Sequence, residues 1–172
     1  MVQRWSRVIL AWISSSLRIQ LFLPLMMALT VAGSAAGGPV AMIQVSDLRA
    51  ESLLAKEKEL ILVIEFSAED CAYCRKLEDL FLLPMQRNAA YGDKILLRTV
   101  SLSEFDSLID FHGRSVTATE FAAQYDVALT PTLVFLNADG VEMSEKLVGI
   151  WSEDFFGGFI DSRIDEARGK LY

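Results

Sequence analysis

The chain contains only two cysteines, and they stand close together as Cys71-Ala72-Tyr73-Cys74. Thiols at this spacing cannot link distant parts of a fold, but they can form and break a local disulfide. They follow an apolar run, residues 60–66, that has the composition of a buried strand. A reactive thiolate is favoured where such a strand leads into a helix. The spacing therefore predicts thiol–disulfide chemistry.

The position of each thiol predicts a different role. Cys71 falls at the start of the expected helix, where unpaired backbone N–H groups and the helix dipole favour an anion. We expect it to be the attacking, solvent-facing sulfur. Cys74 lies one turn later on the apolar face and would be the resolving thiol. The charge of Asp70 opposes a thiolate at Cys71, whereas Arg75 and Lys76 favour it.

A CxxC pair can also be half of a metal site or a haem attachment site. Structural zinc takes four protein ligands, but the chain has one histidine and no third cysteine. A c-type haem site needs histidine directly after the second cysteine, and position 75 is arginine. We therefore expect no metal and no cofactor besides the disulfide itself.

The pattern of apolar residues predicts the elements around the pair. Helices are expected over 46–59, 71–83, 117–125 and 152–170, and strands over 60–66, 94–102, 130–136 and 143–148. Pro84 should end or kink the second helix, and a turn at 137–140 places Gly140 at positive φ. Residues 103–113 are irregular or partly helical. The order predicts an α/β fold, a mixed sheet with helices on both faces and an antiparallel edge.

The helical periodicity also predicts which side chains are buried. The expected buried side chains are, in helix 46–59, Leu48, Leu53, Leu54 and Ala55; in helix 71–83, Cys74, Leu77, Leu80 and Phe81; and in the last helix, Phe155, Phe159, Ile160, Ile164 and Ala167. On helix 71–83, Arg75, Lys76, Glu78 and Asp79 should face outward.

The first 36 residues predict a secretory signal peptide. Arg4, Arg7 and Arg18 precede an apolar stretch over 21–32, and small residues follow up to Ala36. Cleavage there leaves one domain, residues 37–172. An uncleaved membrane anchor is the alternative, although the stretch is short for a span of roughly 20 residues. Both predictions place the domain outside the cytoplasm, in the periplasm or on the inner membrane.

The mature domain would be acidic. The formal charge of −7 becomes −10 when the three arginines of residues 1–36 leave, because that segment contains no acid. An acidic surface argues against nucleic acid as a partner. An exported domain with only one local cysteine pair must also hold its core without disulfide links, so the pair is free for chemistry.

Three features in order resemble the thioredoxin fold. They are the CxxC pair after a long strand, Glu65 six residues before Cys71, and the segment Thr130-Pro131-Thr132-Leu133. The resemblance covers about residues 42–172. It implies that Glu65 is the buried acid that takes the proton of Cys74, with a raised pKa if it is desolvated. An exposed acid at a strand edge is the alternative.

The resemblance also implies how a substrate is bound. Pro131 would form a cis peptide bond beside the cysteines, and Thr130 would pair its backbone with an extended substrate. An ordinary trans proline at the start of a strand is the alternative. Thr130 before this proline is more similar to periplasmic disulfide isomerases and reductases than to cytosolic thioredoxin. Tyr73 resembles the residue between the cysteines of glutaredoxins; it would shape access to the pair, or simply pack.

Softer matches extend the resemblance to exported thioredoxin-like proteins of bacteria, including those associated with sulfur oxidation and cytochrome maturation. They lie at 111–113, 121–127 and 153–164. The expected activity is reduction of protein or peptide disulfides by a monomer that a membrane-bound thiol reductase re-reduces. The alternatives are a disulfide oxidase or isomerase, or a non-catalytic binding or chaperone module. His112, in an insertion at 103–115, is given no role.

Overall fold

The computed structural model describes residues 41–102 and 107–171 of the chain. The predicted signal peptide, residues 1–36, lies outside the described residues, and so does its predicted cleavage site. The beginning of the domain expected over 37–172 and residues 103–106 of the insertion also lie outside them.

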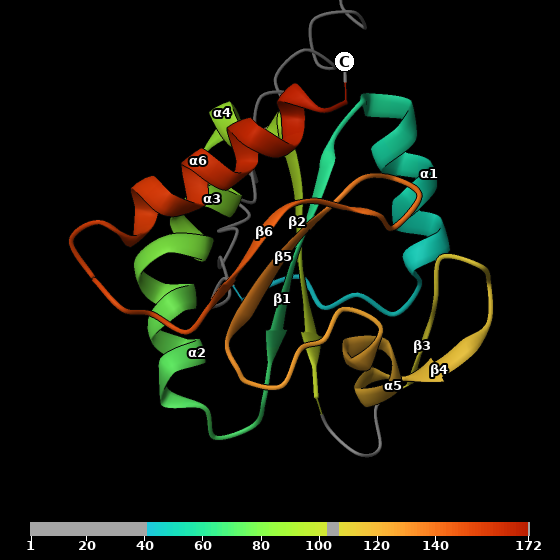
Figure 1. The fold of residues 1–172 in the computed structure, drawn as a ribbon, viewed down its shortest axis with the longest axis horizontal. Helices are drawn as coiled ribbons and strands as arrows, with labels where there is room; N and C mark the ends of the chain where they lie inside the picture. The colour runs from blue at the N-terminus through green and yellow to red at the C-terminus, as the bar shows by residue number, and fades with distance from the viewer. Residues whose placement is uncertain (1–40, 103–106, 172) are drawn as a thin grey trace, which may run out of the picture. The chain divides into compact units, whose positions relative to one another are not determined.

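A four-stranded mixed sheet forms the centre of the domain (Figure 1). Its strands are β1 (Ile61–Ser67), β2 (Ile95–Ser101), β5 (Thr132–Leu136) and β6 (Glu142–Val148), in the order β2-β1-β5-β6. β1 and β2 are parallel, whereas β5 runs antiparallel to both β1 and β6. The predicted mixed sheet with an antiparallel edge is therefore confirmed.

Helices cover both faces of this sheet (Figure 1). Helices α1 (Leu48–Lys58) and α5 (Ala118–Ala123) contribute to the core on one face. The other face is covered by α2 (Ala72–Leu77), the π-helical turn η1 (Glu78–Leu82), α3 (Leu83–Arg87) and α6 (Phe156–Gly169). A single further turn, α4 (Ala89–Gly92), was not predicted.

Alternation along β1 sorts its side chains between the two cores. Leu62, Ile64 and Phe66 belong to the core beneath α1 and α5, and Ile61 and Val63 to the core beneath α2 and α6. Because side chains on a strand alternate with a period of two, Glu65 points to the second core. β1 has a partner strand on each side, so Glu65 is not at a sheet edge.

The helix that begins after Cys71 does not end near Leu83 as predicted. It widens over η1, where the N–H of Leu83 donates to the carbonyl of Glu78, and continues as α3 to Arg87. Pro84 has no N–H and would crowd the carbonyl one turn earlier. A π-helical turn just before the proline accommodates it without ending the helix.

The wider turn and a later start of α6 change which side chains are buried. After η1, Leu82 is buried and Leu80 is exposed, contrary to the prediction. α6 begins at Phe156 rather than at residue 152, so Phe156 takes the buried place and Phe155 lies exposed before the helix. Two further predicted core residues, Leu53 and Phe159, are also exposed.

The insertion contains a small hairpin rather than a helix. β3 (Ser107–Ile109) pairs antiparallel with β4 (Ser115–Thr117). The buried carboxylate of Asp110 closes the turn by accepting from the backbone N–H groups of His112 and Arg114, each at 2.9 Å. These bonds and the Arg114 side chain hold the pKa of Asp110 below its ordinary value, against the opposing effect of its burial. The His112 side chain is exposed.

Gly140 in the predicted turn between β5 and β6 has a φ of +78°, as expected. A Cβ at this position would lie 2.6 Å from Cδ2 of Phe111. Gly140→Ala should therefore combine backbone strain with a clash and lower the free energy of unfolding by about 1–3 kcal/mol. Denaturant unfolding followed by circular dichroism measures this loss.

Gly158→Ala is the matched control for that substitution. Gly158 lies in α6, and a Cβ there would meet no atom within 4 Å. Alanine at such a helical position should stabilise the fold by roughly 0.5–1 kcal/mol. Equal unfolding free energies for the two variants would contradict this account of the turn.

Candidate active site

Cys71 lies at the step from β1 to α2. This connection is at the lower end of the sheet in Figure 1. It is the N-cap residue of α2, and its Sγ accepts the backbone N–H of Cys74 at 3.1 Å. The hydroxyl of Thr130 donates to the same sulfur at 3.7 Å. Two donors aimed at one sulfur stabilise negative charge on it, which suits a thiolate that forms when the disulfide opens.

Cys74 forms a disulfide with Cys71 and is buried, with 1% of its surface exposed. Cys71 is partly exposed. The difference follows from the helix, which turns Cys74 toward the core beside Leu77 and leaves the N-cap residue at the surface. Only Cys71 is open to attack from solvent, and Cys74 can reach only its partner sulfur.

Thr130 and Pro131 come together with the cysteines although 56 or more residues separate them in the sequence. Their peptide bond is cis, as the resemblance implies. Pro131 is buried, and its carbonyl accepts the N–H of Gly149 at 2.8 Å. Among the described residues, the backbone N–H and carbonyl of Thr130 make no hydrogen bond. That backbone is therefore available to pair with an extended chain.

Three exposed apolar side chains lie on the segments that carry or adjoin these residues in the sequence. Tyr73 is 62% exposed, so packing against the core does not explain it. Leu129, just before Thr130, and Trp151, two residues after Gly149, are also exposed. The sequence analysis did not select Leu129 or Trp151, because an apolar residue in a loop carries no signal of exposure.

Glu65 is fully buried, and neither of its carboxyl oxygens has a hydrogen-bond partner among the described residues. Burial and, after it, the charge of Glu78 raise the pKa of this carboxyl to about 8, although Thr99 acts to lower this pKa. A carboxyl with such a pKa changes its ionisation near neutral pH, as an acid–base group must. Glu65 lies on the face of β1 that α2 covers, and Cys74 is one of the buried residues of α2.

Glu78 is the site residue that the sequence analysis missed. It was predicted to face outward, but it is half-buried, and its pKa is raised by burial and by the charge of Asp79. The signal was present in the spacing, since residues four apart share a helix face and Glu78 comes four after the buried Cys74.

No group of three or more metal-ligating side chains occurs among residues 41–102 and 107–171. In the same ranges, no helix has the length and apolar character needed to cross a membrane.

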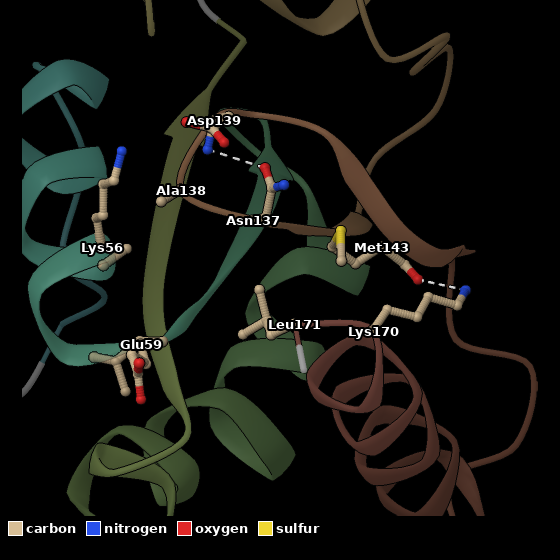
Figure 2. A pocket seen from close by; sticks show the side chains of 10 residues that line it. Lys56, Glu59, Asn137, Ala138, Asp139, Met143, Lys170 and Leu171 are labelled. Atoms are coloured by element: carbon tan, nitrogen blue, oxygen red, sulfur yellow. Dashed lines mark hydrogen bonds between the residues drawn. The ribbon is translucent and has the colours of Figure 1, made fainter.

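A pocket, drawn in Figure 2, lies near the start of β1, where Leu60 is among its lining residues, whereas the cysteines follow the end of this strand. Lys56 and Glu59 approach it from the end of α1, Asn137 and Asp139 from the turn between β5 and β6, and Lys170 from beyond α6. Lys170 donates to the carbonyl of Met143. None of the predicted site residues lines this pocket.

Comparison with known proteins identifies the family. A family model described as a thioredoxin-like domain matches residues 48–162. No curated protein sequence matches the chain. A solved DsbH oxidoreductase is 19% identical, with 73% of this chain and 87% of that chain covered and a TM-score of 0.54.

Two further solved structures are similar to the chain. The thioredoxin of Fasciola hepatica is 20% identical, with 71% and 99% of the two chains covered and a TM-score of 0.46. The periplasmic thioredoxin SoxS of Paracoccus pantotrophus is 22% identical, with 62% and 98% covered and a TM-score of 0.44. The chain belongs to the thioredoxin-like family. Its thioredoxin-like fold and its Cys71–Cys74 pair support thiol–disulfide exchange.

Proposed function

We propose that this protein is an exported thiol–disulfide exchange protein that reduces disulfides in protein or peptide substrates. The observation that carries the proposal is the asymmetric pair, in which Cys71 is partly exposed with two donors on its sulfur and Cys74 is buried behind it. An oxidoreductase needs this division between an attacking and a resolving thiol.

The reaction begins with an extended substrate strand beside Thr130, whose backbone N–H and carbonyl are unpaired among the described residues. The Cys71 thiolate attacks one sulfur of the substrate disulfide, and the other substrate sulfur leaves as a thiolate. Tyr73, Leu129 and Trp151 offer apolar surface around this position. They suit substrates that expose apolar residues near their disulfides.

The Cys74 thiol then loses its proton to Glu65 and attacks the sulfur of Cys71. The Cys71–Cys74 disulfide forms, the bond to the substrate breaks, and the second substrate thiolate takes a proton from water. The protein dithiol has been oxidised by two electrons and the substrate disulfide reduced by two. A membrane-bound thiol reductase would return these two electrons.

The direction of exchange depends on the reduction potential of the pair. Reductases of this fold lie near −270 mV and strong oxidants near −120 mV. Equilibration of the purified protein with defined ratios of reduced and oxidised dithiothreitol or glutathione, followed by alkylation and mass measurement, gives the potential. We expect a reduction potential within about 30 mV of the −270 mV typical of reductases. A potential near −120 mV would instead establish an oxidase.

Export is part of the proposal and rests on the basic start, apolar centre and small-residue exit of residues 1–36. In a bacterial host with two membranes, the mature protein should appear in the periplasmic fraction with its new N-terminus near residue 37. Retention of the full-length chain in the inner membrane would support the anchor instead. Full-length chain in the cytoplasm would contradict both forms of the prediction.

A further inference from the structure

The carboxyl group of Glu65 is fully buried and has no hydrogen-bond partner among the described residues. A buried carboxyl group without a hydrogen-bond partner is costly to ionise, yet the proposed resolving step requires Glu65 to gain and lose a proton. The polar side chains that act on it are Glu78 and Thr99. The Thr99 hydroxyl donates at 3.4 Å to the backbone carbonyl of Glu65. Of these two side chains, only the Glu78 carboxyl, whose pKa is itself raised, can accept and release a proton.

Glu78 is the more solvent-accessible of the two acids. It follows Cys74 by one helical turn, and its backbone N–H donates to the Cys74 carbonyl. It is half-buried, whereas Glu65 is fully buried. It also begins the widened turn η1, which changes the direction of the following side chains and leaves Glu78 on the same side as Cys74.

The other charged groups on this helix do not neutralise the two acids. Lys76 forms an ion pair with Glu153, away from the sheet. Arg75 is exposed and acts on Glu78 more weakly than burial and the charge of Asp79 do. Neither arginine nor lysine is among the groups that act on Glu65. The result is a pair of carboxyl groups that cannot both ionise easily.

We propose that Glu78 is a positioning residue that shares a proton with Glu65 and connects this buried acid to solvent. The inference rests on the proposed function, because it assigns the route by which the proton of Cys74 leaves. The carboxyl pair, and not Glu65 alone, then sets the pH dependence of the resolving step.

The proton balance of the step is simple. Glu65 as a carboxylate takes the proton of Cys74, and the Cys74 thiolate forms the disulfide with Cys71 while the substrate thiolate leaves. Glu78, which holds the shared proton at the start, releases it to water, and protonated Glu65 then passes its proton to the Glu78 carboxylate. Each acid returns to its starting state, and no electron moves through either of them.

Glu78→Gln tests the coupling in the oxidised protein, where no exchange reaction takes place. Carbon-13 NMR of the glutamate carboxyl carbons follows the titration of Glu65, whose signal is identified by its loss in Glu65→Gln. Removing the neighbouring charge should move the Glu65 midpoint to lower pH by about one unit. Asp79→Asn removes the same charge from an exposed neighbour and should leave the midpoint close to that of the wild type.

The relay itself is tested by reducing the protein and mixing it with an aromatic disulfide that releases coloured thionitrobenzoate. The first release reports attack by Cys71, and the second, unimolecular release reports resolution by Cys74. In Glu78→Gln, the pH midpoint for the rate of the second phase should move to lower pH together with the titration of Glu65. The rate of this phase at its high-pH plateau should fall about tenfold. Glu78→Asp should restore part of the plateau.

An unchanged Glu65 midpoint in Glu78→Gln would overturn the coupling. A lowered midpoint with an unchanged plateau would overturn the relay. Absence of any second phase in the wild type would overturn the proposed function, and with it the relay. The NMR titration of the oxidised protein would still show whether Glu65 and Glu78 are coupled. The two failures are therefore distinguishable.

Discussion

Cys71→Ser is expected to reduce disulfide exchange to the rate of the uncatalysed reaction. Cys71 is the only thiol of the pair that is exposed to a substrate, and serine cannot form a mixed disulfide. Because the chain has no third cysteine, no other thiol can take its place. Turbidity from reduced insulin, measured with dithiothreitol as electron donor, checks the loss.

Cys74→Ser is the matched variant for this prediction. It removes one thiol from the same helix but leaves the attacking sulfur in place, so it should lose turnover and still react once with a substrate. Circular dichroism establishes that both serine variants fold. Full activity of Cys71→Ser would favour the alternative of a non-catalytic binding or chaperone module.

Glu65→Gln is expected to slow the resolving step by roughly 10²-fold, because the step loses its general base. Glutamine is nearly the same size as glutamate, so the packing beneath α2 should be kept. The initial attack by Cys71 should be unaffected. Stopped-flow measurement of the two phases separates these steps, and equal slowing of both would contradict a role for Glu65 in resolution alone.

Glu65→Gln should also remove the part of the pH dependence of the unfolding free energy that comes from Glu65. Burial raises the pKa of Glu65 from 4.5 to about 8 in the folded protein, so the native state holds a proton that the unfolded chain releases. The stabilisation from this proton is fully present below pH 4.5 and is lost as the pH rises through 8. The loss approaches 1.4 kcal/mol per pH unit, or roughly 4–5 kcal/mol across the window.

Unfolding by urea at several pH values between 5 and 9 measures this effect. As the pH rises, Glu65→Gln should become more stable relative to the wild type, as measured by the difference between their free energies of unfolding. Comparison of the two proteins cancels the titration of the groups that do not interact with Glu65. A difference that stays constant across the window would show that Glu65 titrates at an ordinary pH.

The sequence predicted the parts of the fold that local physics controls. The apolar run before Cys71 became β1, buried on both faces. The helix predicted over 117–125 became α5, which begins with a capping box of Thr117 and Glu120, and Gly140 took its positive φ. These features depend on neighbouring residues in the chain, so periodicity and turn chemistry were sufficient to find them.

The differences arose where packing overrides local preference. A proline normally ends a helix, but the buried side chains of Leu82 and Met85 hold the chain helical past Pro84. The π-helical turn that results changed the register of the helix and exposed Leu80. The position of Glu78 beside Glu65 depends on how α2 lies on the sheet, which no local pattern specifies.

The resemblance supplied what the residues alone could not. The approach of Thr130 to Cys71 joins segments 59 residues apart, and no periodicity in the sequence indicates it. By contrast, the exposure of Leu129 and Trp151 was found only once the loops had been placed in space.

Mass spectrometry of Cys74→Ser after incubation with a disulfide substrate shows whether Cys71 is the attacking thiol. We expect a covalent adduct of the protein with one half of the substrate, linked through Cys71 and released by dithiothreitol. Absence of any adduct from folded, reduced protein would contradict the claim that Cys71 is the attacking thiol.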